Sequence, residues 1–126
     1  MRKALHDFLT EHCQLITAWY PPHSASVDTP KPYGVIVLDD ELPAVNSNRG
    51  AYQLVQVWPY IDAETSWLDM DDVVDEIKKV FKGRVLQTES GRRFTVEYMR
   101  TGRDFHDTEL EAWTRPMDFR IPQLRP

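Results

Sequence analysis

The sequence has 126 residues, a formal net charge of −5, 41% hydrophobic residues and one cysteine. This length and composition predict a single domain, 1–126, and the acidic balance argues against a dedicated nucleic-acid binder, whose surface is basic. No apolar run approaches the roughly 20 residues that span a bilayer, and Cys13 alone excludes an intrachain disulfide. The charged N-terminus lacks a signal-peptide core, so we expect a protein that stays in the cytoplasm.

The first predicted element is an amphipathic helix over residues 2–18, ended by Pro21 and Pro22. Cys13 and His12 fall within the pattern, so we expect a packing cysteine and a packed or hydrogen-bonded histidine, not a nucleophile or ligand. A loop follows, up to Pro32. The expected apolar stripe comprises Leu5, Phe8, Leu9, His12, Leu15, Ile16 and Trp19.

The central part of the chain predicts two strands and a second helix. Residues 33–38 (YGVIVL) read as a short buried strand, and a polar connection over 39–50 leads to a strand over 51–60. Both faces of that second strand look apolar, and Pro59 is expected to mark its end or an edge of the sheet. Apolar residues then recur at helical spacing from Trp67 to Phe81, with Gly83 placed to end the helix.

The C-terminal third predicts a hairpin and a closing strand. Residues 84–88 and 93–99 form the hairpin, 101–110 read as a polar loop or irregular turn, and 117–121 (MDFRI) alternate as a last strand. Short connections favour antiparallel neighbours. We therefore expect an α+β domain with a single mostly antiparallel sheet of four to five strands and two helices packed on it.

Charge is divided along the sequence. Residues 39–76 contain ten acidic residues and only Arg49 as a base, whereas 78–103 contain eight basic residues and only Glu89 and Glu97 as acids. One interpretation is two solvated faces that keep the chain soluble. The other is a pair of complementary surfaces that meet head to tail in a ring, with a candidate interface of Asp69, Asp71, Asp72, Lys78, Lys79, Lys82, Arg92 and Arg93.

Motifs for catalysis or cofactor binding are not found in the sequence. His106 lies among Asp104, Asp107 and Glu109, but a polar loop often contains such residues by chance, and a site also needs a pocket. The acidic group that starts at Asp69 lacks the glycine and terminal glutamate of a calcium loop, and a helix N-terminus explains it better. We expect no enzyme activity, no cofactor and no metal site.

Taken in order, these segments resemble one family over nearly the whole chain: the tail-completion or tail-terminator proteins of long-tailed bacteriophages. The family includes the head-to-tail joining proteins of siphophages and their prophage relatives. The match consists of an N-terminal amphipathic helix, the strand PYGVIVL (32–38), the strand YQLVQVWPY (52–60), the helix end VVDEIKKVFKG (73–83) and the closing strand MDFRI (117–121).

This resemblance implies a structural virion protein. Family members form hexameric rings that cap the tail tube, stop its polymerisation and dock on the head connector or stopper protein, and DNA passes through the lumen without specific binding. The implied partners are further copies of this chain, the tail-tube protein and the head connector, with assembly in the host cytoplasm and no membrane. Isolated subunits need not form the ring without a template.

The polar connection between the first two strands is the candidate lumen or docking loop. It is long for a hairpin connection, so we expect it to project from the sheet. Its candidate residues are Asp39, Asp40, Glu41, Asn46, Asn48 and Arg49. An alternative function is a small acidic inhibitor or immunity-type module that binds a basic protein through the acidic segment.

Overall fold

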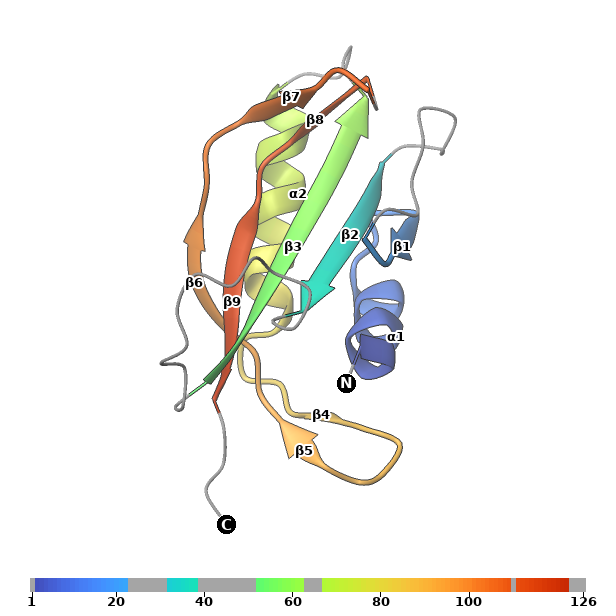
Figure 1. Cartoon of the computed structure of the whole chain (residues 1–126), viewed down its shortest axis with the longest axis vertical. Helices are drawn as coiled ribbons and strands as arrows, with labels where there is room; N and C mark the ends of the chain where they lie inside the picture. Colours follow the sequence, from blue (N-terminus) through green and yellow to red (C-terminus); the bar gives the residue numbers. More distant parts are fainter. Residues whose placement is uncertain (1, 23–31, 39–51, 63–66, 110, 123–126) are drawn as a thin grey trace.

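The structure, a computed structural model, describes residues 2–22, 32–38, 52–62, 67–109 and 111–122. Its two helices are α1 (Arg2–His12) and α2 (Trp67–Val80), and neither is long and apolar enough to cross a membrane (Figure 1). The main sheet contains β1 (Ala18–Tyr20), β2 (Tyr33–Leu38), β3 (Tyr52–Asp62), β6 (Glu97–Thr101), β7 (Phe105–Asp107), β8 (Ala112–Thr114) and β9 (Met117–Pro122). A small second sheet pairs β4 (Leu86–Gln87) with β5 (Arg93–Phe94).

β3 is the central strand of the main sheet. It pairs antiparallel with β2 on one side, and on the other side with β9 along Tyr52–Val57 and then with β8 along Tyr60–Asp62. β6 continues the sheet beyond β9, and β7 continues it beyond β8. Pro59 lies where the partner changes from β9 to β8, a position at which a residue without an N–H is tolerated. The strand therefore continues past Pro59, and the prediction that Pro59 marks an end or an edge is wrong.

The predicted α+β class, the two helices and the mostly antiparallel main sheet are confirmed, but the predictions of a single sheet and of four to five strands are wrong. The main sheet has seven strands. The additional strands β1, β7 and β8 have three residues each, too short for an alternating pattern to stand out in the sequence. β7 falls in the segment predicted as a polar loop. β1 pairs with β2 in parallel, the exception to the antiparallel arrangement.

The first helix is shorter than predicted, because the chain changes conformation after His12. Cys13 N–H still donates to the Leu9 carbonyl (2.9 Å), but Leu15 is 44% exposed and the chain then becomes extended. Thr17 binds the Pro32 carbonyl through its backbone N–H (3.1 Å) and its hydroxyl (2.6 Å), which fixes the start of β1 beside β2. Ile16 and Trp19 lie in this extended segment and are buried in the core. Their spacing therefore matches that of the helix only by coincidence.

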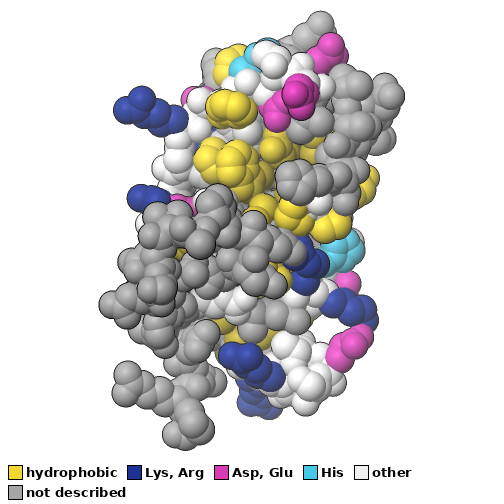
Figure 2. Space-filling model, in the orientation of Figure 1, with side chains coloured by type: hydrophobic (Ala, Val, Ile, Leu, Met, Phe, Trp, Pro, Cys, Tyr) yellow, Lys and Arg dark blue, Asp and Glu magenta, His cyan; other side chains and the backbone are white. Residues whose placement is uncertain are grey.

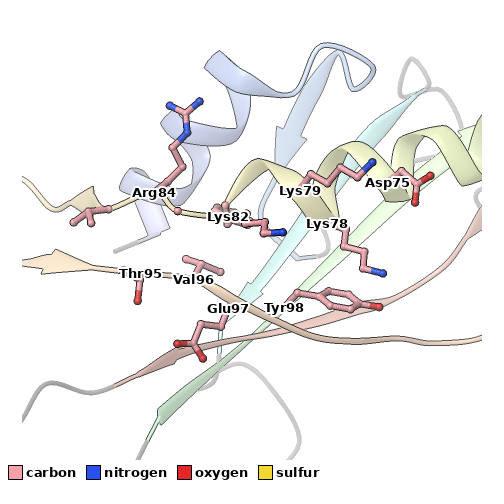
Figure 3. Close-up of a pocket in the computed structure, with 12 residues that line it drawn as sticks. Asp75, Lys78, Lys79, Lys82, Arg84, Thr95, Val96, Glu97 and Tyr98 are labelled. Carbon is pink, nitrogen blue, oxygen red and sulfur yellow. The ribbon is translucent and has the colours of Figure 1, made fainter.

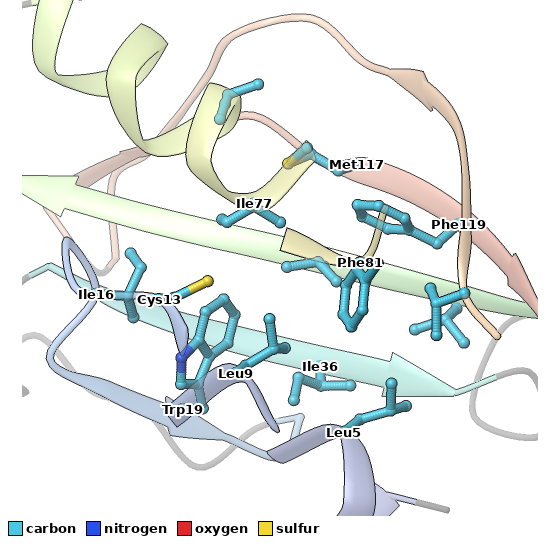
Figure 4. Packing of buried hydrophobic residues seen from close by; sticks show 14 of the residues in the cluster. Leu5, Leu9, Cys13, Ile16, Trp19, Ile36, Ile77, Phe81, Met117 and Phe119 are labelled. Atoms are coloured by element: carbon cyan, nitrogen blue, oxygen red, sulfur yellow. The ribbon is translucent and has the colours of Figure 1, made fainter. Parts of the chain in front are cut away.

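Both helices pack on the same face of the main sheet. Side chains that alternate inward from the strands, such as Ile36, Val57 and Phe119, share one buried cluster with Leu9 of α1 and Ile77 of α2 (Figure 4). Cys13 is buried in this cluster, as predicted, and His12 donates a hydrogen bond from Nδ1 to the Phe8 carbonyl (3.0 Å). The helix after β3 ends as predicted, with Gly83 at a φ of 71°.

The other face of the sheet carries a smaller aromatic cluster and a polar network. Tyr33 stacks on Tyr60 with ring centroids 5.0 Å apart, and Trp58 packs against this pair. Next to them, Asp118 accepts hydrogen bonds from Gln56 (3.1 Å) and Arg100 (2.6 Å). The side chains of β3 on this face are only partly buried. The prediction that both faces of the strand are buried is therefore right for the face that meets the helices and only partly right for this face.

The stability of the fold should fall at alkaline pH, because three buried side chains lose their protons at a higher pH in the folded chain than in the unfolded chain. Burial, and then Glu76, raises the pKa of Cys13 from 9.0 to about 12; burial, and then Asp107, raises those of Tyr33 and Tyr60 from 10.0 to about 12. The unfolded chain therefore loses these protons first, so their stabilising contribution is complete below about pH 9 and is lost as the pH rises towards 12.

Urea unfolding at pH 7 to 10.5 measures this dependence. We expect the free energy of unfolding of the wild type to decrease above pH 9, and that of Tyr33→Phe to decrease less steeply because one titrating group is gone. At pH 7 the Tyr33→Phe change should be close to neutral, since the buried Tyr33 hydroxyl has no hydrogen-bond partner among the described residues. A stability that stays constant up to pH 10.5 would contradict this account.

Candidate functional site

A groove of about 740 Å³ lies between the C-terminal half of α2 and the edge strand β6 (Figure 3). Four basic side chains line it, and we call it the basic groove. Among the described strands, β6 pairs only with β9, so its other edge faces this groove without a strand partner. The lining residues are Asp75, Lys78, Lys79, Phe81, Lys82, Gly83, Arg84, Val85, Thr95, Val96, Glu97 and Tyr98.

The basic residues of the groove are positioned by the C-terminal end of α2. Ile77 and Phe81 face the core, so the neighbouring lysines are turned towards solvent on the last turn of the helix and in the turn that follows it. Cations at this end also complement the negative end of the helix dipole. Gly83 then reverses the chain in a left-handed conformation, and Arg84 N–H donates to the Phe81 carbonyl (3.1 Å). Arg84 and Val85 thus form the end of the groove.

The groove has a net positive charge and an apolar floor. Lys78 lies over the Tyr98 ring, with its Nζ 4.8 Å from the ring centroid, which fixes one cation against the wall. Glu97 accepts a hydrogen bond from Arg120 (2.7 Å), so its charge is largely engaged outside the groove. Among the described residues, no carboxylate forms an ion pair with Lys79, Lys82 or Arg84. The floor is apolar because Phe81 and Val96 are buried beneath it.

The opposite end of α2 meets the β7–β8 hairpin, and acidic side chains gather there (Figure 2). Arg115, whose side chain is 17% exposed, donates to Asp71 of α2 (2.7 Å) and to Asp104 before β7 (2.5 Å). Burial opposes its charge, but these two carboxylates raise the pKa of Arg115. We call this surface the acidic end; its carboxylates are Asp71, Asp72, Asp104, Asp107, Glu109 and Glu111.

The predicted interface residues lie at three separate places: the acidic end, the basic groove and the β4–β5 hairpin. Asp71 and Asp72 belong to the acidic end, and Lys78, Lys79 and Lys82 belong to the basic groove. Arg92 and Arg93 are exposed on the β4–β5 hairpin and do not line the groove. The side chain of Asp69 lies outside the described residues, as do the loop candidates Asp39, Asp40, Glu41, Asn46, Asn48 and Arg49.

Sequence reasoning missed the part of the acidic end that comes from the β7–β8 hairpin, together with Arg84 and the edge position of β6. The Arg115 bridge joins residues 44 and 11 positions apart, so local spacing carries no sign of it. The unbalanced acids between Asp104 and Glu111 are a usable signal of this surface, although local spacing alone predicts only a polar loop around His106.

The surroundings of His106 differ from those of a catalytic or metal-binding histidine. Its ring is exposed and lies 4.7 Å from the Trp113 ring, while Asp104 is engaged by Arg115. Within the described ranges, no three His, Cys, Asp or Glu side chains lie close enough together to hold a metal ion. The basic groove and the acidic end are therefore the surfaces with the most distinct chemistry in the described part of the chain.

Comparison with known proteins finds likeness in structure rather than in sequence. The sequence matches no model of a protein family, and it matches none of the curated proteins. The fold is similar to the structure of bacteriophage SPP1 gp17 protein, with a TM-score of 0.63 and 16% identity over 98% of this chain and 88% of that one. A second solved structure aligns with a TM-score of 0.61 and 13% identity, over 99% of this chain and 94% of its own. At such identities the likeness establishes the shared fold.

Proposed function

We propose that this chain is a bacteriophage tail-completion protein, which closes the growing end of the tail tube as a ring of identical subunits and supplies the surface that meets the head. The observation that carries the proposal is the whole-chain fold likeness to a bacteriophage protein, SPP1 gp17. It agrees with the family resemblance of the five sequence segments, which does not depend on the fold comparison. The protein would then be located in the virion, at the head–tail interface.

Two features of the surface support assembly as a ring. A ring with one repeated contact needs two different and complementary patches on each subunit, because a patch that pairs with itself gives only a dimer. The acidic end and the basic groove differ in charge and lie at opposite ends of α2. A hexamer is the order that the family resemblance implies, with the tail-tube protein below, the head connector above and DNA passing through the lumen. In this function the chain is not an enzyme and binds no cofactor.

Tail morphology tests the proposed function directly. In a phage or prophage that lacks this protein, we expect tail tubes of uncontrolled length and heads without joined tails, because nothing terminates tube polymerisation. Electron microscopy measures the length distribution, and expression of the intact chain from a plasmid should restore uniform tails. Native mass spectrometry of the chain with purified tail-tube protein should show a ring on tube ends. Normal tails in its absence would contradict the proposal.

The acidic end favours one other function, that of an acidic inhibitor or immunity-type module for a basic protein. Six carboxylates on one end of a small domain provide the charge that such a module needs. The neighbouring genes distinguish the two functions: genes for tail-tube and connector proteins favour the ring, whereas a toxin or nuclease gene favours the inhibitor.

A further inference from the structure

The two charged surfaces of this chain have opposite charge, and each carries an exposed apolar side chain and a strand edge without a partner among the described strands. We propose that the acidic β7–β8 hairpin of one copy docks in the basic groove of the next copy, a contact that rests on the proposed ring function and identifies its interface. The geometry joins two different surfaces, so each copy uses its hairpin on one neighbour and its groove on the other. Such a contact is heterologous and repeats around a ring.

Charge is the first argument for this pairing. The groove presents Lys79, Lys82 and Arg84 without ion-pair partners among the described residues, whereas the hairpin presents the exposed carboxylates Glu109 and Glu111. Opposite patches steer association and fix the register of a contact, and like patches of two copies repel each other. The hairpin therefore meets the groove rather than a second hairpin.

Exposed apolar side chains are the second argument. Phe105 at the start of β7 is 54% exposed, and Val85 at the end of the groove is 64% exposed. Single exposed apolar side chains are common on protein surfaces, and these two bear on the contact because they lie on the two surfaces of opposite charge. Docking would bring Phe105 onto the apolar part of the groove near Val85 and remove both from water.

Unpaired strand edges are the third argument. Within the described part of the sheet, β6 pairs only with β9 and β7 pairs only with β8, so each has one edge without a strand partner. Such edges bind strands of another chain through backbone hydrogen bonds. The hairpin that carries β7 is thus suited to lie along β6 of the neighbour.

The position of the two surfaces lets one subunit use both at once. Asp71 marks the acidic end and Lys79 the basic groove, and α2 separates them by about 12 Å along its axis at 1.5 Å per residue. Arg115 fixes the hairpin to α2 through Asp104 and Asp71, so the distance between the surfaces is set by rigid elements. A fixed geometry of this kind is needed for a ring that closes at one size.

Reciprocal charge reversal tests the contact. The groove variant Lys79→Glu/Lys82→Glu and the hairpin variant Glu109→Lys/Glu111→Lys change exposed residues that have no described partner. We expect each variant alone to associate at least about tenfold more weakly than the wild type, since each contact exchanges attraction for repulsion. Mixed in equal amounts, the two variants should assemble again to within about threefold of the wild type, in alternation around the ring. Mass photometry at low ionic strength, with and without tail-tube ends, measures the assembly.

The matched control is Asp7→Lys/Glu11→Lys, which makes the same change in net charge as the hairpin variant on the exposed side of α1, at the opposite edge of the sheet from β6 (Figure 1). It should assemble like the wild type. If the wild type forms rings and both reversed variants form them equally well, the docking contact is refuted while the proposed function stands. If the wild type forms no ring in solution or on tube ends, the proposed function itself fails.

A cross-linking measurement detects the contact even where assembly is weak. In a background without Cys13, single variants Val85→Cys and Phe105→Cys place thiols on the two proposed surfaces. Their mixture should give a heterodimer upon oxidation at least about fivefold faster than a mixture of Val85→Cys with the α1 variant Thr10→Cys, since proximity raises the effective concentration. Equal rates for the two mixtures would overturn the pairing.

Discussion

Replacing Phe119 with alanine is expected to lower the free energy of unfolding by about 4 kcal/mol. Phe119 is completely buried in the middle of β9, and its ring meets those of Phe81, just after α2 (5.4 Å), and Tyr98 of β6 (5.7 Å) edge to face. Truncation would remove one of the contacts between the helix layer and the sheet and would leave a cavity that its neighbours cannot readily fill. Urea unfolding followed by tryptophan fluorescence measures the loss.

Phe105→Ala is the matched control, because it makes the same chemical change at a side chain that is 54% exposed. Its effect on the free energy of unfolding should stay within about 0.5 kcal/mol. If the β7–β8 hairpin docks in the basic groove of the next copy, Phe105→Ala weakens assembly without weakening the fold. Equal destabilisation by the two substitutions would show that Phe119 is not the buried centre of the domain described above.

The elements that the sequence predicted well are those whose local pattern is complete. β2 is a short continuous apolar run, β9 alternates between apolar and charged residues, and α2 has apolar spacing on one face and Gly83 at its end. In each case the burial pattern and the ending signal lie in the same stretch of chain. The boundaries of these elements therefore follow from local chemistry, to within one or two residues.

The elements that were missed depend on contacts between distant residues. β1 exists because Thr17 is bound to Pro32 and Trp19 fills a place in the core, and three residues of strand leave no periodic trace in the sequence. The candidate interface shows the same limit. Its lysines and aspartates were found from charge alone, but the groove depends on β6 being an edge strand, and the acidic end depends on the Arg115 bridge. Both are properties of the assembled sheet.

Gly34→Ala should lower the free energy of unfolding by about 3 kcal/mol, because a side chain at this position has no room. An added Cβ would lie 2.2 Å from Cζ3 and 2.4 Å from Cε3 of the Trp19 ring. Gly34 is paired with β1 on one side and β3 on the other, so its backbone cannot move away without loss of strand pairing. Trp19 is 3% exposed and surrounded by core residues, so the ring cannot swing out either. Urea unfolding of the variant measures the cost.

A double-mutant cycle identifies the Trp19 ring as the cause of that cost. In the Trp19→Leu background the ring atoms that meet the added Cβ are absent, so Gly34→Ala should cost less than about 1 kcal/mol there, a coupling of about 2 kcal/mol. Val35→Ala serves as the control, since the neighbouring side chain points to the opposite face of the sheet and its cost should be the same in both backgrounds. An equal cost of Gly34→Ala with and without the ring would mean that strand conformation, rather than close packing of β2 on Trp19, requires glycine at this position.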